Sequence, residues 1–130
     1  MDLELHNAAR IGDEAEAGLL LHQGHNVNQQ TSTGYTALHW AAGNGHLNMV
    51  RLLLNQGADI NSKLQNGFTA LHITAMEGHQ EVARLLLNQA GINVNAKADL
   101  ESTAEDLACY NRHTAIATLI QSHSSFVYGS

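Results

Sequence analysis

Apolar residues in the centre of the chain recur at three- and four-residue spacing in two short groups, residues 37–44 and 47–56. This spacing predicts two amphipathic helices, one over Ala37–Asn44 and the other from Leu47 to about Gln56. Thr36 is a favoured residue immediately before a helix, and Gly45 and Gly57 suit the left-handed position that ends one. The polar run after Gly57 predicts a hairpin-like loop that leads to the next pair of helices.

This helix–turn–helix unit recurs at a fixed period. Thr36 and Thr69 are 33 residues apart, and so are His46 and His79. A constant period of this length, with small, apolar and turn residues in the same positions, is typical of stacked units that bury their apolar faces against one another. The pattern therefore predicts an all-α solenoid.

Counting outward from the two central units extends the array in both directions. Residues 5–9 align 33 positions before residues 38–42, and Thr103 aligns 34 positions after Thr69. We predict one domain over residues 1–123, with repeats at about 2–31, 32–64, 65–98 and 99–123. The last helix is expected from Thr114 to about Ser122, and residues 124–130 are expected to form a C-terminal tail whose Phe126 and Tyr128 are candidates for folding back on that helix.

In the first and last units, residues that are more polar replace residues of the two central units. Such replacements are typical of the repeats that end an array, because their outer side meets water. In the first unit, Asn7, Glu14 and Ala17 replace Trp40, Leu47 and Val50; in the last, Glu105, Asp106 and Gln121 replace Leu71, His72 and the third leucine of the second helix.

Two stretches carry a family resemblance, GYTALHWAA at residues 34–42 and GFTALHITA at 67–75. With the Gly-His turn, the Leu-Leu-Leu helix and GADIN at residues 57–61, they closely resemble the ankyrin repeat, which has a period of 33 and a Thr-Pro-Leu-His-x-Ala signature. Ala37 and Ala70 stand where that family usually has proline, a mild departure because alanine adopts the same dihedral. The resemblance implies an ankyrin-repeat α-solenoid of four helix-turn-helix units joined by hairpin-like loops.

Nine histidines and one cysteine raise the alternative of a metal-dependent or thiol enzyme. Equivalent positions in adjacent repeats should lie about 8–10 Å apart, too far for two ligands of one Zn²⁺. Six of the histidines occupy two repeat positions: His6, His39 and His72 in the first, and His46, His79 and His113 in the second. For the first of these positions, the resemblance implies hydrogen bonds to the threonine hydroxyl and to neighbouring backbone.

Cys109 falls at the position of Ala42 and Ala75, so we expect a small buried side chain and no nucleophile. We therefore expect no enzyme activity, no catalytic residue, no metal and no cofactor. At each loop start, Asn28, Asn61 and Asn95 are expected to hold a turn by bonding their own backbone.

The net charge of the chain and its apolar runs limit the kinds of partner that it is expected to bind. The net charge is −6, and the six lysines and arginines are scattered, which argues against binding to nucleic acid. No apolar run approaches the roughly 20 residues that a membrane-spanning helix needs, and the N-terminus lacks the features of a signal peptide. We expect a cytoplasmic monomer that binds another protein, or an effector secreted without a classical signal peptide.

The resemblance places the binding surface on the loop tips and on the concave face of the first helices. Tyr35 and Phe68 are equivalent, and we expect an aromatic row that Met76 and Tyr110 extend, because such residues anchor protein interfaces. The candidate partner-binding residues are Ser32, Thr33, Tyr35, Lys63, Gln65, Asn66, Phe68, Met76, Glu77, Lys97, Asp99, Leu100, Tyr110 and Asn111, with Arg10, Ile11, Gln30 and Asn44 at related positions.

Three alternatives stay open for these residues. Tyr35 and Phe68 could instead pack on neighbouring loops for stability alone, and Trp40 is expected to pack between repeats. Lys63 and Lys97 could attract an acidic or C-terminal carboxylate segment, although two charges in water contribute little. The predicted function is protein–protein interaction, and the alternatives are an inhibitor or regulator of an enzyme such as a kinase, or a bacterial effector that targets a host protein.

Overall fold

The structure, a computed structural model, describes residues 3–129, with side chains described for residues 3–123. Within that range the chain is helical and contains no β-strand. Four helix pairs follow one another, and a 3₁₀ turn, η1 (Asp99–Glu101), precedes the last pair. The pairs are α1 (Glu4–Ile11) and α2 (Glu14–His22), α3 (Ala37–Gly43) and α4 (Leu47–Asn55), α5 (Ala70–Glu77) and α6 (Gln80–Leu87), and α7 (Ala104–Tyr110) and α8 (Thr114–Gly129).

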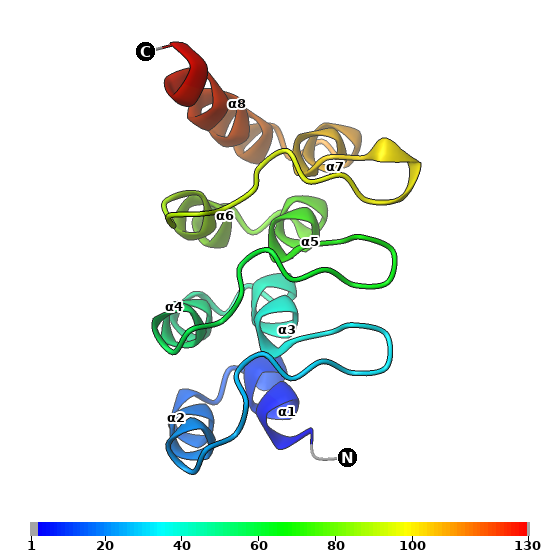
Figure 1. Cartoon of the computed structure of the whole chain (residues 1–130). Helices are drawn as coiled ribbons and strands as arrows, with labels where there is room; N and C mark the ends of the chain where they lie inside the picture. Colours follow the sequence, from blue (N-terminus) through cyan, green and yellow to red (C-terminus); the bar gives the residue numbers. More distant parts are fainter. Residues whose placement is uncertain (1–2, 130) are drawn as a thin grey trace.

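The pairs stack into two columns, which confirms the predicted all-α solenoid. The first helices of the pairs, α1, α3, α5 and α7, form one column, and the second helices form the other (Figure 1). The loops that join successive pairs project to the same side of the stack (Figure 1). Each unit therefore contacts mainly the units before and after it, as a repeat array should.

A threonine caps the first helix of the second, third and fourth pairs, as the sequence predicts. Thr36, Thr69 and Thr103 each accept a hydrogen bond from the backbone N–H three residues later, and the side chain at that later position bonds back to the threonine N–H. These reciprocal bonds satisfy two backbone donors that a helix start leaves unpaired. The first unit has Leu3 at this position, and α1 begins without a side-chain cap.

The glycine of each Gly-His turn has two roles, of which the sequence predicted one. Gly78 has a φ of 85°, in the left-handed region that favours glycine. A Cβ atom at Gly78 would also lie only 2.5 Å from the imidazole ring of His113, which belongs to the next repeat. That ring packs over the turn and bonds the Met76 carbonyl through Nε2 at 3.1 Å. The same contact joins His46 to Arg10 and His79 to Gly43, so this second set of histidines links consecutive repeats.

The core lies between the two helix columns. Leu38, Leu53, Leu71 and Leu86 are at most 2% exposed, in agreement with the predicted register. Met49 is also buried, although it lies outside the apolar stripe predicted for its helix. The buried arc of α4 is wider than one stripe because α3, α2 and α6 all pack against this helix.

Two predictions about the first and last helix pairs are wrong. Ala17 is fully buried and does not contribute to the water-facing side, whereas Asn7 and Glu14 are exposed as expected. The last helix continues past Ser122 to Gly129, because the intervening residues include no glycine or proline to end it. The predicted fold-back of Phe126 and Tyr128 lies outside the described side chains.

Cys109 is exposed, in contrast to the buried position predicted for it. The equivalent Ala75 is fully buried. Within the described chain no further repeat packs on the outer side of α7, so that side meets water. There Gln121 Nε2 donates to Glu105 Oε2 at 2.7 Å, so two of the polar replacements in the last unit pair with each other.

Candidate partner-binding surface

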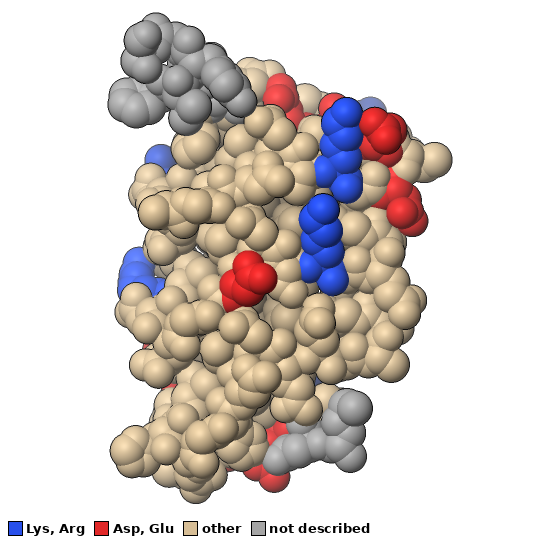
Figure 2. Space-filling model, in the orientation of Figure 1, with Lys and Arg blue, Asp and Glu red and all other residues tan. Residues whose placement is uncertain are grey.

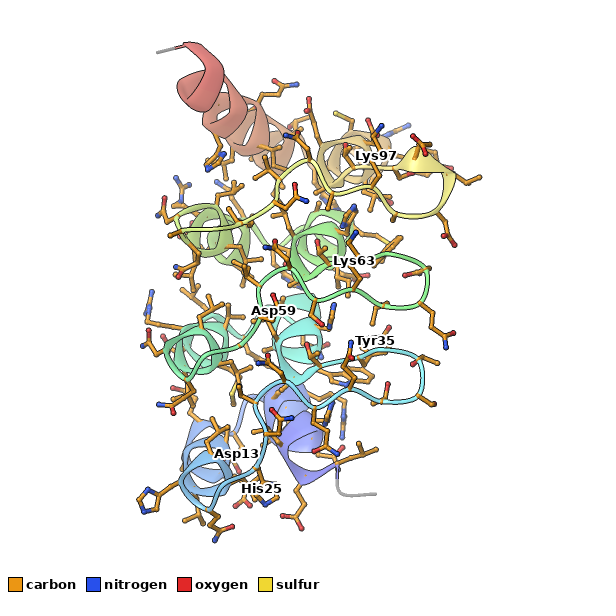
Figure 3. The ribbon with its side chains drawn as sticks, in the orientation of Figure 1. Asp13, His25, Tyr35, Asp59, Lys63 and Lys97 are labelled. Atoms are coloured by element: carbon orange, nitrogen blue, oxygen red, sulfur yellow. The ribbon has the colours of Figure 1, made fainter. Side chains whose placement is uncertain are left out.

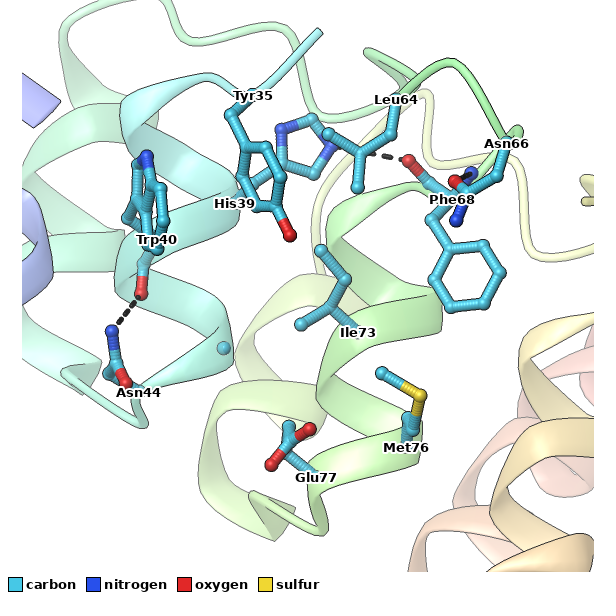
Figure 4. A pocket seen from close by; sticks show the side chains of 11 residues that line it. Tyr35, His39, Trp40, Asn44, Leu64, Asn66, Phe68, Ile73, Met76 and Glu77 are labelled. Carbon is cyan, nitrogen blue, oxygen red and sulfur yellow. Dashed lines mark hydrogen bonds between the residues drawn. The ribbon is translucent and has the colours of Figure 1, made fainter. Parts of the chain in front are cut away.

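A groove of about 300 Å³ lies between the second and third repeats, and we call it the central groove (Figure 4). Its walls come from the two loops that precede α3 and α5 and from the exposed sides of those helices. Of the predicted partner-binding residues, it brings together Tyr35, Asn66, Phe68, Met76 and Glu77. It also includes Asn44, at one of the related positions, and its other lining residues are His39, Trp40, Gly43, Leu64 and Ile73.

The two predicted anchor rings each pack on a helix of their own repeat. Tyr35 stacks on Trp40, with ring centroids 4.6 Å apart and an interplanar angle of 22°. Phe68 stacks on the imidazole of His72 at 5.5 Å and 27°. Both rings are half-buried, so each has a stabilising contact and still lines the groove. Tyr35 also lines a smaller hollow with Leu64, Gln65 and Asn66 of the next loop, so the alternative that the rings pack on neighbouring loops stays a prediction.

Trp40 belongs to the candidate surface as well as to the packing between repeats. It is half-buried against the core, and its ring separates the central groove from a second hollow of about 230 Å³ towards the first repeat. That hollow is lined by Leu3, His6, Asn7, Arg10 and Thr31 in addition to Trp40. Sequence reasoning assigned Trp40 to packing because an apolar residue on a short helix is usually in the core.

The groove is polar at the end where α3 and α5 terminate (Figure 4). Asn44 Nδ2 donates to the Trp40 carbonyl at 3.0 Å, and no described residue donates to the Asn44 Oδ1 atom. Glu77 is exposed and has no ion pair with any described residue. At the loop end, Asn66 Oδ1 accepts from the Phe68 N–H at 3.1 Å. Between the two ends lies Ile73, which is 8% exposed.

The buried side chain of His39 lines the groove and bonds to one of the loops that form it. His39 Nδ1 accepts a hydrogen bond from the Thr36 N–H at 3.1 Å, so the ring proton must be on Nε2. Nε2 then donates to the carbonyls of Ser62 at 3.0 Å and Phe68 at 3.2 Å, both in the next loop. Burial lowers the pKa of His39 below its ordinary value of 6.5. The neutral ring therefore ties one helix start to the loop that carries Phe68.

His72 and His6 occupy the same position in their repeats. His72 forms the equivalent bonds to Thr69 and to the Ser102 carbonyl, and burial also lowers its pKa. His6 Nε2 bonds the Tyr35 carbonyl at 3.1 Å, but its buried Nδ1 has no partner among the described residues because Leu3 replaces threonine. The bonds expected for this histidine position are confirmed in the two central repeats.

A comparison with known protein families matches ankyrin repeats (3 copies) to residues 5–98 and again to residues 57–127. The chain belongs to the ankyrin repeat family. Ankyrin repeats are in general protein–protein interaction modules. No curated protein matches this chain.

The tips of successive ankyrin loops are bonded to one another. Gln65 donates through its backbone N–H to the Thr33 carbonyl at 3.1 Å and through Nε2 to the Ser32 carbonyl at 3.0 Å. Ser32, Thr33 and Gln65 are exposed, as predicted for partner-binding residues. Their mutual bonds hold the loops in register, a role that the sequence did not reveal because the two partners are 32 and 33 residues apart.

The two lysines lie one above the other at the same position of successive loops (Figures 2 and 3). The face that displays them carries few other charges (Figure 2). Lys97 Nζ is 3.1 Å from Glu101 Oε2, and both side chains are well exposed. Lys63 has no ion pair with any described residue. The predicted attraction for an acidic segment therefore depends mainly on Lys63.

The remaining predicted residues belong to the fourth ankyrin repeat and lie apart from the central groove. Leu100 is 96% exposed and has a φ of 63°, which a leucine rarely adopts. Tyr110 is 86% exposed, Asp99 and Asn111 are also exposed, and none of the four lines the groove. The aromatic row therefore reaches from Tyr35 through Phe68 to Met76, without Tyr110.

Two of the asparagines at the loop starts, Asn28 and Asn61, connect repeats, although they were expected to bond their own turns. Asn61 Nδ2 donates to the Gly91 carbonyl, and Asn61 Oδ1 accepts from the Asn93 N–H, both at 2.8 Å. Asn28 makes the same pair of bonds to the next repeat. The local turn is instead held by the residue two positions earlier, as when Asp59 accepts from the Asn61 N–H at 3.0 Å.

The described residues contain neither a metal-binding cluster nor a helix that could span a membrane. Within residues 3–123, no three His, Cys, Asp or Glu side chains come together as a metal ion would require. In the part of the chain that the structure describes, no helix is both long enough and apolar enough to cross a bilayer.

Proposed function

We propose that this ankyrin array binds another protein through the central groove and the loop tips beside it. The observation that carries the proposal is the meeting of Tyr35, Phe68 and Met76 in one groove, each half-buried and each in contact with the groove space. Large apolar side chains that are fixed by packing and still reach a groove are the residues that anchor protein interfaces.

The rigidity of the surface supports this function. Gln65 holds one loop tip to the next, and His39 holds the loop of Phe68 to the start of α3. A partner would therefore meet a surface that is already ordered, so little conformational entropy is lost when it binds. A face of this kind can offer on the order of 800 Å² to a partner, which is the area of a standard interface.

The groove test uses a triple variant, Tyr35→Ala, Phe68→Ala and Met76→Ala, with Leu19→Ala as the matched control. Leu19 is an apolar residue of α2 that is 51% exposed and lies outside the groove. A partner isolated by affinity capture is titrated against each variant by calorimetry. We expect a loss of at least about tenfold in affinity for the triple variant, because an interface anchor contributes on the order of 1 kcal/mol or more.

The Leu19→Ala variant should bind as the parent protein does. Unchanged affinity in the triple variant, with its helix content retained, would rule out the central groove as the binding surface. An activity assay on the captured partner then separates two modes of action. Inhibition indicates a regulator of an enzyme such as a kinase, or an effector that disables its target, and unchanged activity indicates a scaffold.

A further inference from the structure

We propose that the central groove receives a basic side chain of the partner, and arginine in preference to lysine. This inference rests on the proposed function and specifies the chemistry of the partner at that site. It follows from the hydrogen-bonding capacity that the groove leaves unused, from its apolar middle part, and from the distribution of charge on the chain.

The unused capacity at the polar end consists of acceptors. The Asn44 NH₂ group must face the Trp40 carbonyl, because only a donor can bond there, so the free atom of that amide is its oxygen. The Glu77 carboxylate accepts up to four hydrogen bonds and receives none from the described residues. Both residues lie at the C-terminal ends of their helices, where the backbone dipole also favours a positive charge.

The middle of the groove requires an apolar stem. Tyr35, Phe68 and Ile73 line the path from the loops to the polar end, with Met76 beside Glu77 (Figure 4). A purely apolar side chain would cover this path and leave the acceptors without donors, and an acidic one would be repelled by Glu77. Lysine and arginine combine an apolar stem with a charged head that donates hydrogen bonds.

The cation has to come from another molecule. None of the six lysines and arginines of the chain lines the central groove, and the chain has a net charge of −6. Arginine fits better than lysine because its planar fork can donate two parallel hydrogen bonds to the Glu77 carboxylate and can stack on an aromatic ring.

The test uses four capped peptides, Gly-Gly-Xaa-Gly-Gly, in which Xaa is arginine, lysine, citrulline or glutamate. Trp40 is the single tryptophan, so its indole N–H resonance and its fluorescence report on the groove. We expect saturable shifts with the arginine peptide, weaker binding of the lysine peptide, and no saturable response to the other two.

The matched variants are Glu77→Gln and Glu81→Gln. Glu81 is an exposed carboxylate of α6 that pairs with Arg84 at 3.9 Å, and it does not line the groove. We expect Glu77→Gln to weaken binding of the arginine peptide by up to about fivefold, the upper end of the range for an exposed ion pair. Glu81→Gln should leave the affinity unchanged.

Three results would overturn the proposal: no shift of Trp40 with the arginine peptide, an equal shift with citrulline, or the same affinity in the parent and Glu77→Gln. Failure of the proposed function has a different signature. In that case the captured partner binds the triple groove variant as tightly as it binds the parent. If only the arginine proposal fails, partner binding still depends on Tyr35 and Phe68, but removal of the charge at Glu77 does not change the affinity.

Discussion

Replacement of His39 tests whether the buried histidines hold the repeats together. His39 and Thr36 are each 2% exposed. His39→Ala removes the acceptor of the Thr36 N–H and the donor that bonds the carbonyls of Ser62 and Phe68. Each lost partner costs about 1 kcal/mol net, and the cavity left by the ring adds about 1–2 kcal/mol. We therefore expect the free energy of unfolding to fall by about 4–5 kcal/mol.

Two further variants show how much of the lost unfolding free energy comes from the helix cap and how much from the bonds to the next loop. His39→Asn should retain the bond to the Thr36 N–H, as Asp106 does with the Thr103 N–H in the fourth repeat, and lose only the bonds to the next loop. It should therefore cost about 1 kcal/mol less than alanine, the contribution of the one bond that it retains. His6→Ala is the matched control, because His6 is also buried but, among the described residues, its ring bonds only the Tyr35 carbonyl.

The assay is urea denaturation followed by circular dichroism, with the unfolding free energy extrapolated to water. His39→Ala should lower the unfolding free energy by about 2 kcal/mol more than His6→Ala, the difference that two additional hydrogen-bond partners imply. Equal losses for the two alanine variants would refute the reasoning. A loss for His39→Asn as large as for His39→Ala would place the energy in the bonds between repeats, which both variants lose, and a much smaller loss would place it in the helix cap that asparagine retains.

Two other predictions concern the core and pH. Leu53→Ala, at a position that is 0% exposed, should cost about 2–5 kcal/mol in urea denaturation, and Leu54→Ala, at a half-buried position, should cost clearly less; equal costs would contradict the described register. Burial lowers the pKa values of His39 and His72 in the folded chain, so the unfolded chain binds protons first as the pH falls through 6.5. Stability should therefore be complete above that pH and decline below it, by up to about 1.4 kcal/mol per pH unit for each histidine, until the folded pKa is passed. Denaturation at several pH values should show a shallower decline for His39→Asn, and a pH-independent difference between that variant and the parent would contradict the prediction.

The fold could be predicted from the sequence because each of its determinants is local. Thr36, the apolar spacing that follows it and Gly45 specify a helix start, a buried stripe and a turn within a few residues of one another. Their return after 33 positions then fixes the stacking, since each unit can bury its apolar face only against the next. This is why the helix pairs and the central leucines lie where the sequence places them.

The candidate site was predicted only in part. The sequence identified Tyr35, Phe68, Met76 and Glu77 as members of one surface, and the structure brings them into one groove. It missed Trp40, whose position on a short helix is also typical of core packing, and it added Tyr110 to a row that ends before it. Equivalence between repeats shows which residues face the same way, but it does not show which side chains meet.

The sequence by itself determined the repeat, its register and the helix caps, since these follow from residues within one unit of about 33. Only the tertiary structure decided what depends on a neighbouring unit: that Asn61 bonds the next loop, that the ring of His113 covers Gly78, and that Cys109 is exposed where Ala75 is buried. The physical reason is that burial and hydrogen bonding at these positions are set by the unit stacked beside them. A residue in the last described repeat therefore meets water where the same position in a central repeat meets protein.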